Sequence, residues 1–267
     1  MILHETINLL KNKYKDYIET LTISEVRIGV FMTAIKLSDN SYGISSTVPN
    51  IQMNCNKKNR DFGDFTPNNI VGKKVIDLLE TTKQNGIIDT LTVAVLNAVS
   101  SRIIENSNYK ILSNTDPIDL IDLNSGKTIT IVGAFHSYIQ KISATNSKLY
   151  VLELNEDAFM EDDKKYYVPT SDYPKILPIS DVVLITGLTL VNNTLDDLLK
   201  TVKPETQIIV SGPSSSFIPD VLFANNVKII GSLKITNPEL MLKVISEAGA
   251  GYHLFNYCAE KICIVND

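Results

Sequence analysis

The residues best suited to chemistry lie at the ends of two predicted strands in the second half of this sequence. Gly133, Phe135 and His136 come directly after Thr128 to Val132, and Glu153 lies in the next such segment. A glycine turn after a strand, with an acidic residue about 20 positions further on, is typical of a nucleotide-binding βαβ unit. The turn has one glycine where a dinucleotide fingerprint has three, which disfavours a pyrophosphate cofactor. The alternatives are that Gly133 only permits a tight turn and that Glu153 is an exposed strand-end carboxylate.

Small and polar residues also follow the next two predicted strands. The carboxyl ends of parallel strands lie at one edge of a sheet, and small residues there let a ligand approach backbone N–H groups. We therefore expect ligand-binding residues in two segments: Thr186, Gly187, Asn192, Asn193 and Thr194, and then Ser211, Gly212, Pro213 and Ser214. The structural alternatives are a helix cap at Thr194, turn-forming asparagines, and serines that cap a helix at Phe217.

His136 is the candidate metal ligand. It lies in the glycine turn, where an imidazole could bind a metal ion or carry a proton, and the alternative is an exposed residue at the start of a helix. The other histidines and the cysteines lack the spacing of known zinc motifs: His4, His253, Cys55, Cys258 and Cys263. Because the chain has no G-x-S-x-G elbow, P-loop or kinase signature, no catalytic residue is assigned.

Composition excludes several classes of protein. The chain has 267 residues, 44% hydrophobic and 21% charged, which is typical of a folded globular protein. A net charge of −5 with scattered basic residues argues against a nucleic-acid partner. No uninterrupted apolar run is long enough to span a bilayer, and the N-terminus lacks a signal pattern. We expect a cytoplasmic protein without a membrane partner.

The second half of the chain alternates between strands and helices, which predicts a doubly wound, mostly parallel sheet. The apolar runs VVLITG and QIIVSG are typical of strands covered on both faces. The predicted strands are 128–132, 149–154, 181–186, 207–211, 227–231 and 261–265, with helices over 194–202, 217–225 and 238–249.

The first half predicts an α+β domain. An amphipathic helix extends from Ile7 to Leu21, and a strand over 26–37 pairs with one over 42–48. Helices follow over 73–82 and 86–105, the second apolar enough to be buried on most sides. The segment Pro49 to Asn69 lacks periodicity. A polar connector places the boundary between domains 1–108 and 109–267.

The order of these features resembles one known family. VRIGVFMTAIKL and a hairpin strand are followed by TIVGAF, DVVLITG, an N-x-T-L-D segment and a G-P-S run. This succession is similar to the putative heavy-metal chelation family. The resemblance implies a domain like the enolase N-terminal domain, followed by a Rossmann-like domain, with the site in the cleft between them. The chain departs from the family's pattern at Asn192-Asn193 and at Phe65 to Gly72, two segments that could line such a cleft.

Three functions fit these features. The first is a protein that handles a transition-metal ion or a metal-bearing small molecule, as the resemblance implies. The second is an enzyme with a nucleotide or S-adenosyl cofactor held by Gly133 and Glu153. The third is a non-catalytic scaffold subunit, with the cleft as the surface of a homodimer.

Overall fold

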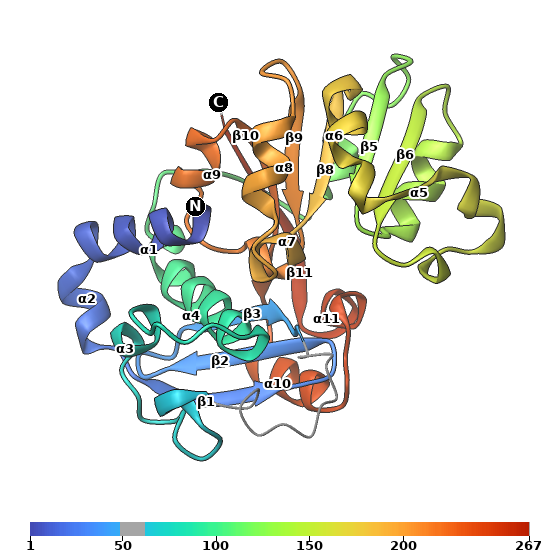
Figure 1. The fold of residues 1–267 in the computed structure, drawn as a ribbon. Helices are drawn as coiled ribbons and strands as arrows, with labels where there is room; N and C mark the ends of the chain where they lie inside the picture. Colours follow the sequence, from blue (N-terminus) through green and yellow to red (C-terminus); the bar gives the residue numbers. More distant parts are fainter. Residues whose placement is uncertain (49–61, 267) are drawn as a thin grey trace.

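The computed structural model describes residues 1–48 and 62–266 and confirms the α/β class. Two sheets lie one above the other, with a long helix packed between them (Figure 1). The strands of the small sheet all precede residue 108 and those of the large sheet all follow residue 109. The boundary between domains 1–108 and 109–267 nevertheless stays a prediction.

The large sheet has eight strands in the order β4-β11-β10-β9-β8-β5-β6-β7. Strands β5 to β10 pair parallel with one another, whereas β11 pairs antiparallel with both β10 and β4. A mostly parallel sheet is therefore confirmed. The strands are β4 (Lys110–Ser113), β5 (Thr128–Val132), β6 (Lys148–Glu153), β7 (Tyr167–Pro169), β8 (Val182–Thr186), β9 (Gln207–Ser211), β10 (Val227–Ile235) and β11 (Ala259–Val265).

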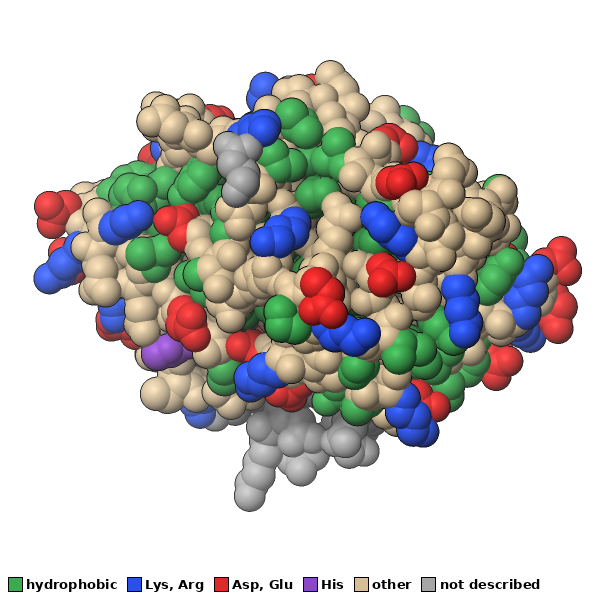
Figure 2. Space-filling model, turned by 90° about the horizontal axis from the view of Figure 1, so that it is seen from above, with side chains coloured by type: hydrophobic (Ala, Val, Ile, Leu, Met, Phe, Trp, Pro, Cys, Tyr) green, Lys and Arg blue, Asp and Glu red, His purple; other side chains and the backbone are tan. Residues whose placement is uncertain are grey.

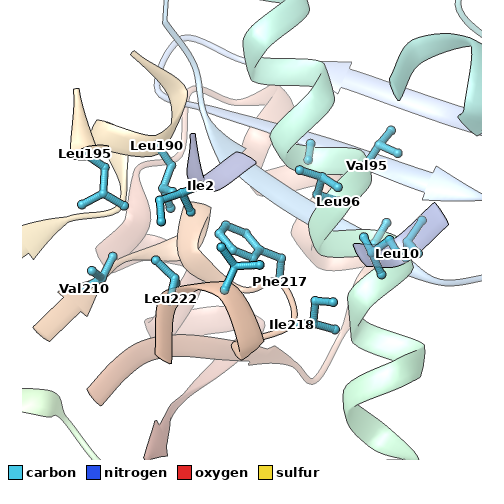
Figure 3. Packing of buried hydrophobic residues seen from close by; sticks show 14 of the residues in the cluster. Ile2, Leu10, Val95, Leu96, Leu190, Leu195, Val210, Phe217, Ile218 and Leu222 are labelled. Carbon is cyan, nitrogen blue, oxygen red and sulfur yellow. The ribbon is translucent and has the colours of Figure 1, made fainter. Parts of the chain in front are cut away.

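Successive strand residues point to opposite faces of the large sheet. Both faces are buried, because each packs in its own core cluster. Ile131, Leu184 and Ile209 lie in one core cluster, which includes the inner face of α5 (His136–Ser143). Their neighbours in sequence lie in a second and larger cluster. Figure 3 shows the middle of that larger cluster, where Phe217 and Leu222 lie among side chains of α1 and α4. The remaining helices of this half are α6 (Tyr173–Ile176), α7 (Leu188–Val191), α8 (Leu195–Thr201), α9 (Asp220–Ala224), α10 (Pro238–Ser246) and α11 (Gly251–Tyr257).

The small sheet corrects one prediction. The single strand predicted over 26–37 is two strands, β1 (Ile23–Ile28) and β2 (Met32–Leu37), which pair antiparallel. The chain reverses at Gly29, whose N–H donates to the Met32 carbonyl. A Cβ at Gly29 would lie 2.3 Å from the Ile245 carbonyl oxygen of α10, so only glycine fits. The apolar, β-branched sequence concealed this turn, while β3 (Tyr42–Ser46) forms as predicted.

The long helix α4 (Gly86–Glu105) forms over the predicted residues and packs on the small sheet. The Asn85 side chain caps its first turn by accepting from the N–H groups of Ile87 and Ile88. Among the described helices, α4 alone is long and apolar enough to cross a membrane, but 72% of its most apolar window is buried inside the protein. It is therefore a core helix. The other helices of the first half are α1 (Ile2–Lys13), α2 (Lys15–Thr20) and α3 (Val75–Leu79); the helix predicted over 7–21 is divided at Tyr14.

The last helices of the chain return to the first half. Met241 and Ile245 of α10 and Leu254 of α11 form a core cluster with Met32 and Ala34 of β2. The small sheet is thus covered by α4 on one face and by C-terminal helices on the other (Figure 1). Strand β4 and helix α11, which contains His253, were not predicted.

Candidate functional site

A pocket of about 550 Å³ lies at the carboxyl ends of β5, β6 and β8, and we call it the strand-end pocket. In the large sheet, β6 and β7 lie on one side of β5, whereas β8, β9 and β10 lie on its other side. The strand order therefore reverses between β5 and β8, which is where open parallel sheets bind ligands. Its lining residues are Val132, Gly133, Ala134, Phe135, Leu152, Glu153, Leu154, Thr170, Ser171, Tyr173, Thr186, Leu188, Thr189, Asn192, Thr194, Asp197 and Leu198.

Gly133 is required by the geometry of the turn after β5. Its φ is +104°, a conformation that residues with a Cβ rarely adopt. A Cβ at this position would also lie 3.1 Å from the Cγ2 atom of Thr186 on β8. The glycine therefore serves the tight turn and at the same time keeps the pocket open between β5 and β8.

Glu153 folds its carboxylate back onto the glycine turn. One oxygen accepts from the Ala134 N–H at 3.0 Å, and the other accepts from the N–H groups of Leu154 at 2.7 Å and Asn155 at 3.4 Å. Hydrogen bonds to a carboxylate are stronger than those between neutral groups. The Glu153 carboxylate therefore has a structural role, because it holds the turn after β5 at the edge of the pocket.

The residues after β8 form the opposite wall. Oδ1 of Asn192 accepts from the Thr194 hydroxyl at 2.7 Å and from the Thr194 N–H at 3.3 Å. Thr194 is the N-cap residue of α8, but its side chain makes no capping hydrogen bond because the hydroxyl is directed to Asn192. The Thr186 carbonyl accepts from the Thr189 hydroxyl at 2.7 Å. These bonds hold the amide and hydroxyl groups of this wall in place.

A network of side chains behind the Phe135 ring supports it. Its ring stacks on Tyr138 with the centroids 5.1 Å apart, and the Tyr138 hydroxyl donates to Asp116. Asp116 also receives a hydrogen bond from Lys261 of β11. Burial, and then the Asp116 hydrogen bond, raise the pKa of Tyr138, so this hydroxyl stays protonated at neutral pH. The network holds the aromatic wall of the pocket against the sheet.

The structure brings some of the predicted site residues together and separates others. Gly133, Phe135, Glu153, Thr186, Asn192 and Thr194 line the strand-end pocket. The others lie outside its lining: His136, Gly187, Asn193, Ser211, Gly212, Pro213 and Ser214. Sequence patterns did not single out Tyr173 and Asp197 as lining residues, because loop folding and helix orientation bring them to the pocket.

The segment from Gly212 to Ser214 joins the two halves of the chain. The buried side chain of Asn97 on α4 donates to the carbonyls of Ile44 at 2.6 Å, Pro213 at 3.1 Å and Ser214 at 3.3 Å. The Ser214 hydroxyl accepts from the Ser46 N–H at 2.8 Å. These residues hold β3 and α4 to the end of β9.

A second cavity, also of about 550 Å³, lies between the two halves, and we call it the interface cavity. Tyr42 and Arg102 line it from the first half, and Ser232 and Lys234 line it from the second. None of the predicted site residues lines it.

The described residues do not fit a heavy-metal ion bound by soft side chains. Such ions favour thiolate and imidazole ligands, yet no group of three or more His, Cys, Asp or Glu residues suited to a metal is present in the described ranges. His136 is exposed at the start of α5. Burial raises the pKa of Cys258, and burial followed by the charge of Asp116 raises that of Cys263 to about 12, so both remain thiols. Cys55 lies outside the described residues.

Figure 2 shows one face of the molecule, on which basic and acidic side chains are interspersed. The expected absence of a nucleic-acid partner stays a prediction.

Comparison with known proteins places these features in context. Two family models, both described as putative heavy-metal chelation, match residues 116–264 and 11–100. An uncharacterised protein of Methanocaldococcus jannaschii is 26% identical over 198 residues, which are 72% of this chain and 71% of that protein.

Two crystal structures share the fold over essentially the whole chain. A protein of unknown function from Pyrococcus horikoshii, from the family matched over 116–264, has a TM-score of 0.80 and 22% identity, with 100% of both chains covered. A second family protein of unknown function, from Desulfitobacterium hafniense, has a TM-score of 0.74 and 18% identity, with 99% of this chain and 98% of that chain covered. At such identities the likeness establishes the fold.

Proposed function

Because this chain belongs to the putative heavy-metal chelation family, we propose that it binds a small organic molecule in the strand-end pocket and handles metal as part of that molecule. The observation that carries this proposal is the pocket itself, which lies where the strand order reverses and is walled by six of the expected residues. Its Phe135 and Tyr173 rings and leucine side chains suit an organic body.

The donor set favours a metal-bearing molecule over a bare ion. A soft ion would need thiolate or imidazole ligands, whereas the pocket has hydroxyls, one side-chain amide and carboxylates. An organic ligand that already chelates its metal needs from the protein only shape, apolar contact and a few hydrogen bonds.

The strand-end pocket is also favoured over the cleft between the halves, where the resemblance places the site. The interface cavity is lined by residues of both halves but by none of the residues expected to bind ligand. Its cationic residues are paired with neighbouring glutamates, Arg102 with Glu105 at 3.5 Å and Lys234 with Glu260 at 3.4 Å.

Native mass spectrometry with elemental analysis tests the proposal on protein purified from its own host. We expect a bound organic molecule and expect Ser171→Trp to abolish its binding, because Ser171 is an exposed lining residue and an indole there takes up space at the pocket without entering the core. Ser137→Trp, an exposed position on α5 outside the lining, is the matched control and should retain the molecule. Tight binding of a bare transition-metal ion, unaffected by Ser171→Trp, would contradict the proposal.

A further inference from the structure

The strand-end pocket is acidic. Among the described residues that line it, the charged ones are Glu153 and Asp197. Asp197 is 69% exposed and pairs with Lys200 at 3.5 Å, so water screens its charge. Glu153 is closer to the sheet and bonds directly to the glycine turn. The side chains best suited to phosphate groups are lysine and arginine, whereas the charged side chains of this lining are two carboxylates.

The Glu153 carboxylate also occupies the position that an anionic ligand would need. In nucleotide-binding βαβ units the backbone N–H groups of the turn after the first strand, at the start of the helix, bind the phosphate oxygens. Here the N–H of Ala134, directly after Gly133, already donates to Glu153 at 3.0 Å. A phosphate could reach this amide only by displacing a carboxylate held by two further N–H groups.

From these two observations we propose that Glu153 determines the ligand class: the strand-end pocket accepts an uncharged or cationic molecule with an apolar body and rejects phosphate-bearing nucleotides. The inference rests on the proposed function for the use of the pocket, but the role of Glu153 can be tested without the ligand. The carboxylate replaces the phosphate on the turn, and its charge repels any further anion. The ring of Phe135, backed by Tyr138, offers a face suited to a cation or a planar group.

Inorganic pyrophosphate is the probe for this inference, with the Ala134 amide signal in ¹⁵N NMR of the full chain as the readout. In the wild-type protein this signal should not move with added pyrophosphate. Glu153→Ala frees the amide and removes the charge, so pyrophosphate should bind about tenfold more tightly or better. Glu153→Gln removes the charge but keeps an acceptor for the amide, and its affinity should lie between the two.

Glu156→Ala is the matched control, because this exposed carboxylate lies three positions further along the chain and outside the pocket lining. It should behave as the wild type does. Glu153→Gln keeps the test decisive if Glu153→Ala does not fold. The inference is overturned if pyrophosphate binds the wild type as tightly as the variants, or if neither Glu153 variant gains affinity.

The two proposals fail separately. An organic molecule lost in Ser171→Trp, without any gain of pyrophosphate binding in the Glu153 variants, supports the proposed function and overturns the role of Glu153. A gain of pyrophosphate binding in a protein that never carries a molecule in the pocket does the reverse. A co-purified molecule whose phosphate contacts the Ala134 amide overturns the inference directly.

Discussion

Gly133 and Glu153 determine the shape of the strand-end pocket at the scale of single residues. Gly133 provides the positive φ that turns the chain out of β5, and Glu153 accepts from the amide that this turn exposes. Neither role needs a bound cofactor. The pair explains why the chain has the outline of a nucleotide-binding turn without its glycine triplet.

Gly133→Ala should destabilise the protein by about 2 kcal/mol or more, because it adds backbone strain and a contact with Thr186. Gly72→Ala is the matched control. Its φ is +89°, but a Cβ there has no atom within 4 Å, so it should cost only the backbone strain, about 1 kcal/mol. Urea denaturation measures both. Equal losses would show that the Thr186 contact is unimportant.

Asn97 is a second residue whose contribution can be measured alone. Asn97→Leu removes the donor that three carbonyls share, while it also removes an Oδ1 atom that has no hydrogen-bond partner among the described atoms. We expect a net loss of about 1–3 kcal/mol in the free energy of unfolding. Asn106→Leu, exposed at the end of the same helix, should cost within about 0.5 kcal/mol. A loss for Asn97→Leu no larger than this would contradict the proposed bridging role.

At the scale of elements, helix α4 lies directly on strand β3. A Cβ at Gly43 would lie 2.1 Å from the Ala94 carbonyl oxygen and 2.3 Å from the Ala98 N atom. Backbone atoms cannot move aside as a flexible side chain can. The glycine thus determines how closely α4 approaches the small sheet.

Gly43→Ala should therefore destabilise the protein by more than about 3 kcal/mol, or prevent folding, because it forces α4 away from β3. Thermal denaturation followed by circular dichroism measures the loss. Gly126→Ala, where the nearest atom is 3.9 Å from the new Cβ, is the control and should cost about 1 kcal/mol. A Gly43→Ala protein as stable as this control would show that the two elements are not in close contact.

Asp116 joins α5 to β11, and its ionisation makes this part of the sheet sensitive to acid. Burial alone would raise its pKa, but hydrogen bonds from Lys261 and Tyr138 outweigh burial and lower it below the usual 3.8. A folded-state pKa below the unfolded value stabilises the protein above about pH 4, and this stabilisation is lost as the pH falls through the folded pKa.

Asp116→Asn should therefore lower stability at pH 7 by about 1–3 kcal/mol and reduce its further decline in acid. Asp119→Asn is the control, because this carboxylate is 58% exposed and pairs with Lys141 at the surface. It should change stability by less than about 1 kcal/mol. Urea denaturation between pH 3 and pH 7 measures both. If the stability of Asp116→Asn declined in acid as steeply as that of the wild type, the prediction would be contradicted.

At the scale of the whole molecule, the two halves of the chain contribute side chains to the same hydrophobic core clusters. One cluster contains Leu10 and Ile35 from the first half together with Phe217 and Ile230 from the second. Another joins Met32 of β2 to α10 and α11. The first half alone would expose one face of its sheet and much of α4.

A fragment of residues 1–108 should consequently fail to fold on its own, and the full chain should unfold in one cooperative transition. The NMR spectrum of the fragment and urea denaturation of the whole chain measure these outcomes. A well-dispersed spectrum from the fragment, or two separate transitions, would indicate independently folding domains.

Local sequence determined much of this architecture. Continuous apolar runs predicted β5, β8 and β9 nearly to the residue, and the buried pattern of α4 predicted both its ends. Such elements are specified by the period and composition of their own residues. The sequence also placed Gly133, Glu153 and Asn192 at strand ends, and therefore at one edge of the sheet.

Only the tertiary structure decided which of these residues meet. Only glycine fits at the turn after β1 because a carbonyl of α10, more than 200 positions later in the chain, lies against Gly29, and no local pattern can reveal this contact. The folded helices and loops bring Tyr173 and Asp197 to the pocket, and the contacts of α4 direct Ser214 into the junction between the halves. Contacts between residues far apart in sequence depend on how whole elements pack, so the charge of the pocket became visible only in the fold.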